Sequence, residues 1–184
     1  NDPAVHDSYF TRPTPAQIAH YTTDLVTAVR NRDLPHLRSV LRQEQTEEQD
    51  EEGEDDQHQH QRSCSRRGGG RLDCRNRFGE SLLHAACRRG YDDVARFLLV
   101  EAGVSIRARD DYGRTPLHDA CWTAHPNYDL MDVLLKNGGR DAAELLLVHD
   151  VRGHVPFDYA RREHWKGWIQ FVEERKELLR EVMS

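Results

Sequence analysis

The stretch GRTPLHDACW, residues 113–122, decides the fold of this chain. Gly113 can take a positive φ and make a tight turn, and Thr115 is suited to cap a helix. Pro116 then takes the first helical position, where its missing N–H removes no hydrogen bond. Three small or apolar side chains share one face of this helix and leave room for a second helix to pack closely: Leu117, Ala120 and Cys121.

This stretch belongs to an internal repeat. NRFGESLLHAACRRG, residues 76–90, aligns without gaps with DDYGRTPLHDACWTA, residues 110–124. The two copies share a glycine, a histidine and an Ala-Cys pair, and Gly79 and Gly113 are 34 residues apart. A repeat of this length predicts stacked supersecondary units.

Two weaker copies flank this pair. DVRGHVPFDYARRE, residues 150–163, has a glycine, a proline and an alanine in the matching places. Gly153 follows Gly113 by 40 residues, so this copy carries extra residues, around the letters PNYD or GGRDAA. DLVTAVRNRDLPHLRSVL, residues 24–41, repeats the two-helix pattern at half length.

Each unit is expected to continue into a second helix. In the first full copy this helix is DDVARFLLVEAG, which is apolar on one face and ends at Gly103. The letters VSIRARDDYG, residues 104–113, then predict an extended hairpin before the next turn. Because helices this short are unstable alone in water, the units must stack to bury their apolar faces.

These residues resemble the ankyrin repeat family, whose unit of about 33 residues carries a T-P-L-H-x-A signature and two helices. The match is nearly complete over residues 113–120 and covers residues 24–41 and 73–171 in all. The resemblance implies an all-α solenoid of about four helix–turn–helix units with short β-hairpin turns. It also implies that the signature histidine hydrogen-bonds the turn.

The chain departs from the family pattern in three places. Residues 81–84, SLLH, lack the proline, and residues 155–158, VPFD, lack the histidine. Ala124 stands where a glycine is usual. Since terminal repeats are atypical in solenoids, the last copy is expected to be a cap, and so is the first.

A polar segment separates the first unit from the second. Residues 43–61 hold nine acidic residues and no lysine or arginine, and cannot bury enough apolar area to offset the entropy of ordering. The expected organisation is an N-terminal tail at 1–20, a capping repeat at 21–42, a disordered insertion at 43–70, repeats at 71–162 and a closing helix at 163–184.

His118, Asp119 and Cys121 are reactive residue types within a short span. A histidine and a cysteine three positions apart on a helix can share a metal or form a thiolate–imidazole pair. The same spacing recurs at His84 and Cys87, however, so it is a property of the repeated unit. We therefore predict a structural role for these residues, with no cofactor and no catalytic site.

A second candidate metal site combines His58 and His60 with Cys64 and Cys74. The spacing matches none of the close ligand pairs typical of zinc sites, so no metal is predicted here. An independent metal or redox protein is the alternative, which zinc content would test. Because the sequence holds no P-loop, G-x-S-x-G, H-E-x-x-H or kinase signature, no enzyme is predicted.

Composition narrows the class of partner. The net charge is −6, and outside the acidic segment the basic excess is too small to predict nucleic-acid binding. The basic run at residues 62–77 could contact phosphate, but is more typical of a solvated linker that balances the preceding acids. No apolar run of about 18 residues or signal peptide is present, so neither membrane insertion nor secretion is predicted. Four scattered cysteines indicate reduced thiols in the cytoplasm or nucleus.

In the family, partners bind the concave surface built from the turns and first helices. Since Trp, Tyr and Arg are enriched in hot spots, Tyr112 and Trp122 are the strongest candidates, supported by Arg89 and Arg114. The alternative for Trp122 is burial in the core. The other expected contact residues are Arg77, Phe78, Glu80, Arg88, Asp111, Asp119, Thr123, Val151, Arg152 and His154.

The predicted function is that of a monomeric, non-enzymatic module or adaptor that binds a protein on this concave face. The alternative is that the chain is the ankyrin portion of a longer enzyme or channel and recruits its substrate. The fold alone does not choose between them.

Overall fold

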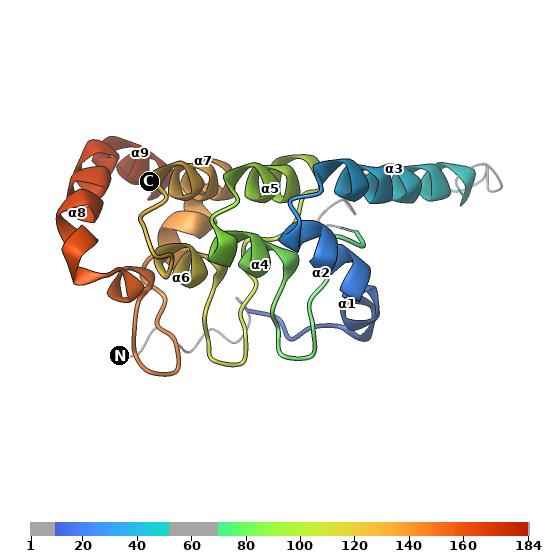
Figure 1. Ribbon diagram of the computed structural model, residues 1–184, viewed down its shortest axis with the longest axis horizontal. Coiled ribbons are helices and arrows are strands. Elements are labelled where there is room, and N and C mark those ends of the chain that lie inside the picture. Colours follow the sequence, from blue (N-terminus) through green and yellow to red (C-terminus); the bar gives the residue numbers. More distant parts are fainter. Residues whose placement is uncertain (1–9, 52–69, 184) are drawn as a thin grey trace.

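The computed structural model describes residues 10–51 and 70–183, which form a stack of helical units (Figure 1). The first helices of successive units lie side by side in one row: α2 (Thr23–Arg30), α4 (Leu82–Arg89) and α6 (Pro116–Cys121). The second helices form a parallel row: α3 (Leu34–Glu51), α5 (Asp92–Arg96) with its π-helical continuation η2 (Phe97–Glu101), and α7 (Tyr128–Leu145). We number these three helix pairs units 1, 2 and 3.

A fourth, atypical unit closes the stack. It begins with a 3₁₀ turn, η3 (Pro156–Tyr159), that packs on α6, and continues through η4 (Arg162–His164). The last two helices, α8 (Trp165–Glu174) and α9 (Lys176–Met183), cover the end of the stack, and α9 contacts α7 (Figure 1). A short helix, α1 (Pro15–His20), precedes unit 1.

One apolar core runs through all units. Leu37, Leu98 and Leu134 from the second helices are fully buried, as are Leu83 and Leu117 from the first helices. The small residues between them allow close packing, because Ala86 and Ala120 have almost no exposed surface. The all-α stack of helix pairs predicted from the sequence is thus confirmed.

Loops project from the helix rows and end in three fingers, which we define as residues 75–81, 109–115 and 149–155 (Figure 1). The tight turn in each contains a glycine with positive φ, +83° at Gly79 and +77° at Gly113. The predicted hairpins are fingers in shape, but among the described residues they form no strand, and only an isolated antiparallel bridge joins Arg75 to Ser81. In each finger a backbone hydrogen bond crosses the turn, as from the Asp110 N–H to the Arg114 carbonyl oxygen, and a side-chain cap accepts from two other backbone N–H groups.

The extra residues of unit 3 lie on both sides of the second helix. The N-caps Tyr91 and Asn127 are 36 residues apart, as are the positive-φ glycines Gly103 and Gly139. Since Gly79 and Gly113 set a repeat of 34 residues, two additional residues precede α7. The others follow Gly139, where the backbone leaves helical geometry and then resumes a short helix to Leu145.

The prediction of disorder from residue 43 is wrong as far as residue 51, because α3 continues through this stretch. Glutamate and glutamine are good helix formers, and contacts with a distant residue support the helix. Glu44 accepts a hydrogen bond from the Arg71 backbone N–H (2.6 Å), and Glu47 pairs with the Arg71 guanidinium. The rest of the predicted insertion, with His58, His60 and Cys64, lies outside the described residues.

The single closing helix predicted at 163–184 is in fact broken at Arg175, between α8 and α9. The Arg175 guanidinium lies over the Phe171 ring (3.8 Å to the centroid) and pairs with Asp132 of α7. Trp168 and Phe171 are buried against Tyr128. We infer that these contacts of Arg175 with α7 and Phe171, and not helix propensity, place the break between α8 and α9 at this residue. The predicted tail at 1–20 likewise contains a helix, α1, from residue 15.

Candidate protein-interaction face

Each finger is held by one polar side chain that caps its own loop. Oδ1 of Asp110 accepts hydrogen bonds from the backbone N–H groups of Tyr112 (3.0 Å) and Arg114 (2.8 Å). Asn76 and Asp150 make the corresponding pairs of bonds in the other two fingers, at 2.9 to 3.1 Å. The sequence reasoning missed these caps, although the recurring pattern Asn/Asp-x-x-Gly is a signal of Asx turns.

The signature histidines join each unit to the next. Nδ1 of His84 accepts from the Ser81 backbone N–H (3.2 Å), and its Nε2 lies 3.1 Å from the Arg114 carbonyl oxygen in the following finger. His118 repeats this geometry, with Nε2 3.2 Å from the His154 carbonyl oxygen. Since Nδ1 accepts, Nε2 carries the proton and donates across the unit boundary.

Burial keeps both histidines neutral. Desolvation lowers the pKa of His84 to about 4 and also lowers the pKa of His118. Neither ring is exposed, so neither is available to a ligand. The structural role predicted for His118 is confirmed.

The fingers and first helices expose aromatic rings along one face. Phe78 and Tyr112 stand at the tips of two successive fingers, exposed by 49% and 52%. Trp122, at the end of α6, is 54% exposed, so the alternative of core burial does not apply. Its ring leans on Tyr159, with 6.2 Å between ring centroids. We call this surface the arginine–aromatic face. It comprises the rings of Phe78, Tyr112 and Trp122 and the side chains around them on the fingers and first helices, among which Arg77 and Arg114 contact the rings.

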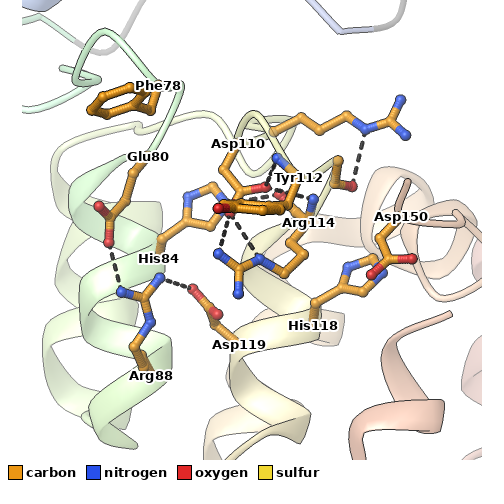
Figure 2. A network of polar contacts seen from close by, with 12 residues as sticks. Phe78, Glu80, His84, Arg88, Asp110, Tyr112, Arg114, His118, Asp119 and Asp150 are labelled. Atoms are coloured by element: carbon orange, nitrogen blue, oxygen red, sulfur yellow. Dashed lines mark hydrogen bonds and ion pairs between the residues drawn. The ribbon is translucent and has the colours of Figure 1, made fainter. Parts of the chain in front are cut away.

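Arg114 lies between two of the rings. Its guanidinium is 5.0 Å from the Tyr112 centroid and 5.8 Å from the Trp122 centroid. Its Nη2 pairs with Asp110 (2.7 Å), the residue that caps the finger (Figure 2). The ion pair thus couples the finger backbone to the aromatic rings. Arg114 was expected to be an exposed contact residue, but it is half-buried and its charge is paired.

Arg88 connects unit 2 to unit 3. Its guanidinium contacts Glu80 (2.8 Å) from its own unit and Asp119 (2.8 Å) from α6 (Figure 2). Asp119 was predicted to be an exposed contact residue, and this is wrong, because only 1% of its surface is exposed. The neighbouring arginine allows burial: desolvation raises the pKa of Asp119, and the hydrogen bond from Arg88 opposes this.

Other predicted contact residues occupy different parts of the same face. Arg89 and Thr123 line a shallow hollow of about 400 Å³ beside the ends of α4 and α6. Glu80 and Thr123 are half-buried. The remaining members of the predicted set are exposed, on the fingers or the adjoining helix ends: Arg77, Arg88, Asp111, Val151, Arg152 and His154.

The cysteines of this region are structural. Cys74, Cys87 and Cys121 are buried free thiols, and burial raises the pKa of each, to about 12 for Cys74. A thiol, not a reactive thiolate, is therefore present at neutral pH. Within residues 10–51 and 70–183, no group of three or more His, Cys, Asp or Glu side chains is placed to hold a metal. No helix in this part of the chain is long and apolar enough to cross a bilayer.

Comparison with known proteins agrees with the architecture. The family model for ankyrin repeats (3 copies) matches residues 25–144. Mouse BCL-6 corepressor-like protein 1 is 38% identical over 71 residues, which are 37% of this chain. The ADP-ribosylation factor GTPase-activating protein AGD2 of Arabidopsis thaliana is 44% identical over 66 residues, or 36% of this chain. The bovine SMC5-SMC6 complex localization factor protein 1 is 30% identical over 113 residues, or 46% of this chain.

The chain corresponds to a small part of these relatives, covering 4%, 8% and 11% of their respective lengths. The shared feature is the repeat stack itself, which is a non-catalytic fold used for protein interaction. The family model spans well over half of the described residues, and the histidine bonds, glycine turns and helix pairs all fit it. The chain therefore belongs to the ankyrin repeat family.

Proposed function

We propose that this chain binds a partner protein on the arginine–aromatic face, as an interaction module without catalytic activity of its own. The observation that carries the proposal is the row of half-exposed rings at Phe78, Tyr112 and Trp122. Tyr and Trp are enriched among the few residues that contribute most of the binding energy at protein interfaces.

The face is ordered before any partner arrives. Arg114 is fixed by Asp110 and lies against both Tyr112 and Trp122, and Arg88 is fixed by Glu80 and Asp119. Side chains held in this way lose little rotamer freedom on binding, so more of the contact energy goes into affinity.

A second candidate is that the chain is the recruiting portion of a longer enzyme. The 44% identity to a short part of AGD2, a protein named as a GTPase-activating protein, favours it. Both candidates use the same face, and they differ in what the rest of the protein does. The length of the intact gene product would distinguish them.

The experiment is an affinity pull-down with the intact chain and with the double variant Tyr112→Ser, Trp122→Ser. The matched control is Val100→Ser, Ile169→Ser, since these four side chains are all between 52% and 59% exposed and the control pair lies on η2 and α8. Circular dichroism checks that each variant retains its helices. Proteins retained by the intact chain and the control but lost by the first variant would support the proposal.

Two results would contradict it. The face is wrong if the double variant and the control lose the same proteins. It is also wrong if the double variant retains every protein that the intact chain retains. An exposed aromatic hot spot is expected to contribute at least about 2 kcal/mol, which corresponds to an affinity about thirtyfold weaker when it is removed.

A further inference from the structure

The charges of the arginine–aromatic face do not balance. Its acidic side chains are mostly engaged within the molecule: Glu80 and Asp119 pair with Arg88, and Asp110 pairs with Arg114. Engaged carboxylates attract a cationic partner only weakly because their charge is already neutralised.

Three other arginines on the same face have no such partner. Arg77, Arg89 and Arg152 form no ion pair within residues 10–51 and 70–183. Among the carboxylates of the three fingers, α4 and α6, two form no ion pair with a described residue, Asp111 and Asp150. Asp150 is buried and accepts hydrogen bonds from Arg152, His154 and Tyr159, so Asp111 is the exposed one of the two. One exposed carboxylate from the second-helix row, Asp129, borders the same hollow as Arg89. The face thus offers a surplus of unneutralised guanidinium groups beside its exposed rings.

The placement of these groups suits carboxylate ligands. The Arg77 guanidinium lies over the Phe78 ring, 4.7 Å from its centroid. Contact with the ring face leaves the in-plane N–H donors of a guanidinium open, in the fork geometry that binds a carboxylate. Arg89 borders the hollow that Thr123 also lines, and Arg152 stands on the third finger, which Asp150 fixes through the Arg152 backbone N–H (2.9 Å).

We propose that the partner segment bound on this face is an acidic stretch of polypeptide with interspersed apolar side chains. Its carboxylates pair with Arg77, Arg89 and Arg152, while its apolar groups contact Phe78, Tyr112 and Trp122. This inference rests on the proposed function and adds the chemistry of the partner to it.

The test starts from a random library of displayed 12-residue peptides selected on the intact chain. Selected peptides are synthesised with a fluorophore, and binding is measured by anisotropy at low and high salt. The test variant carries Arg77→Gln, Arg89→Gln and Arg152→Gln. The control carries Arg42→Gln, Arg96→Gln and Arg140→Gln, which removes the same charge from exposed positions on the second-helix row.

We expect selection to enrich Asp and Glu, and affinity to fall as salt rises. The test variant should bind about tenfold or more weakly, since each lost charge pair contributes a few-fold, and the control should stay within about twofold. Selection of neutral or basic peptides, selection of none, or equal weakening in both variants would overturn the inference. The inference would also be overturned if a labelled single-stranded oligonucleotide bound the intact chain more tightly than the selected peptides do, and lost this affinity in the test variant.

The two proposals can fail separately. If the Tyr112→Ser, Trp122→Ser variant loses its partners while the triple glutamine variant keeps them, the face is a binding site but its partner is not acidic. If both variants keep the partners, the partners do not bind on the arginine–aromatic face.

Discussion

Replacing His84 with alanine tests whether the buried histidine joins units 2 and 3. The ring is fully buried, and its removal leaves the Ser81 backbone N–H without its acceptor. The Arg114 carbonyl oxygen loses the bond across the unit boundary but keeps one from the Asp110 N–H (2.9 Å). The substitution therefore creates a cavity, one unsatisfied donor and one weakened acceptor.

The expected loss can be summed from these parts. An unsatisfied buried donor costs about 1–2 kcal/mol, and the lost acceptor bond adds about 0.5 kcal/mol. The cavity adds about 1 kcal/mol or more. We expect the free energy of unfolding to fall by about 3 kcal/mol, which for a chain of this size lowers Tm by about 6–12 °C. Urea unfolding followed by circular dichroism measures the first quantity, and a thermal scan the second.

The pH dependence gives a second readout of the same residue. The pKa of His84 is about 4 in the folded chain and about 6.5 when unfolded. Between these values the unfolded state binds more protons, so the stability contributed by the neutral ring is complete above pH 6.5 and is lost as pH falls toward 4. His84→Ala should flatten this fall in stability, and the remaining slope should come partly from His118.

The matched control is His36→Ala. His36 is a partly exposed histidine that pairs with Asp24 (2.7 Å) at the surface. Surface pairs of this kind contribute about 0.5 kcal/mol or less. The reasoning is refuted if the two histidine variants lose similar stability, or if His84→Ala keeps the full pH dependence of the parent chain.

Two further predictions concern the turns and the buried ion pair. A Cβ added at Gly79 (φ +83°) would lie 2.2 Å from the Arg109 carbonyl oxygen, whereas one added at Gly153 (φ +80°) would meet no atom within 4 Å. Gly153→Ala should therefore cost about 1 kcal/mol of stability and Gly79→Ala at least about 2 kcal/mol more, and equal losses in urea unfolding would contradict this. Arg88→Gln should lower the free energy of unfolding at neutral pH by about 2 kcal/mol because it leaves the buried Asp119 carboxylate without its cation. Adding Asp119→Asn should restore most of the lost free energy of unfolding. A double variant no more stable than Arg88→Gln would show that an unpaired Asp119 charge is not the cause of the loss.

Much of the fold could be predicted from the sequence because the determining interactions are local. The turn glycine, the capping residue and the histidine lie within a few positions of one another, as Gly113, Thr115 and His118 show. Since the same letters recur at a fixed interval, one unit predicts the next. The exposure of Tyr112 and Trp122 follows in the same way, from their register in the repeat.

The errors arose where contacts between distant residues decide the outcome. The helical extension of α3 is supported by Arg71, which follows the intervening polar segment. The burial of Asp119 depends on Arg88 from the neighbouring unit, and the break after α8 depends on Asp132 of α7. A pattern within one window of sequence contains no information on these partners.

The hydrogen bonds of the signature histidines run in one direction along the stack, each from one unit to the following finger, and the series ends at the fourth unit. Units 2 and 3 each donate from an imidazole to the following finger, so each presents a ready donor for a successor. In the fourth unit Asp158 takes the histidine position, and its carboxylate accepts from the Val155 N–H (2.9 Å). A carboxylate that only accepts cannot propagate the series. An array lengthened by design should therefore grow by inserting copies ahead of the third finger, not by adding them after η3.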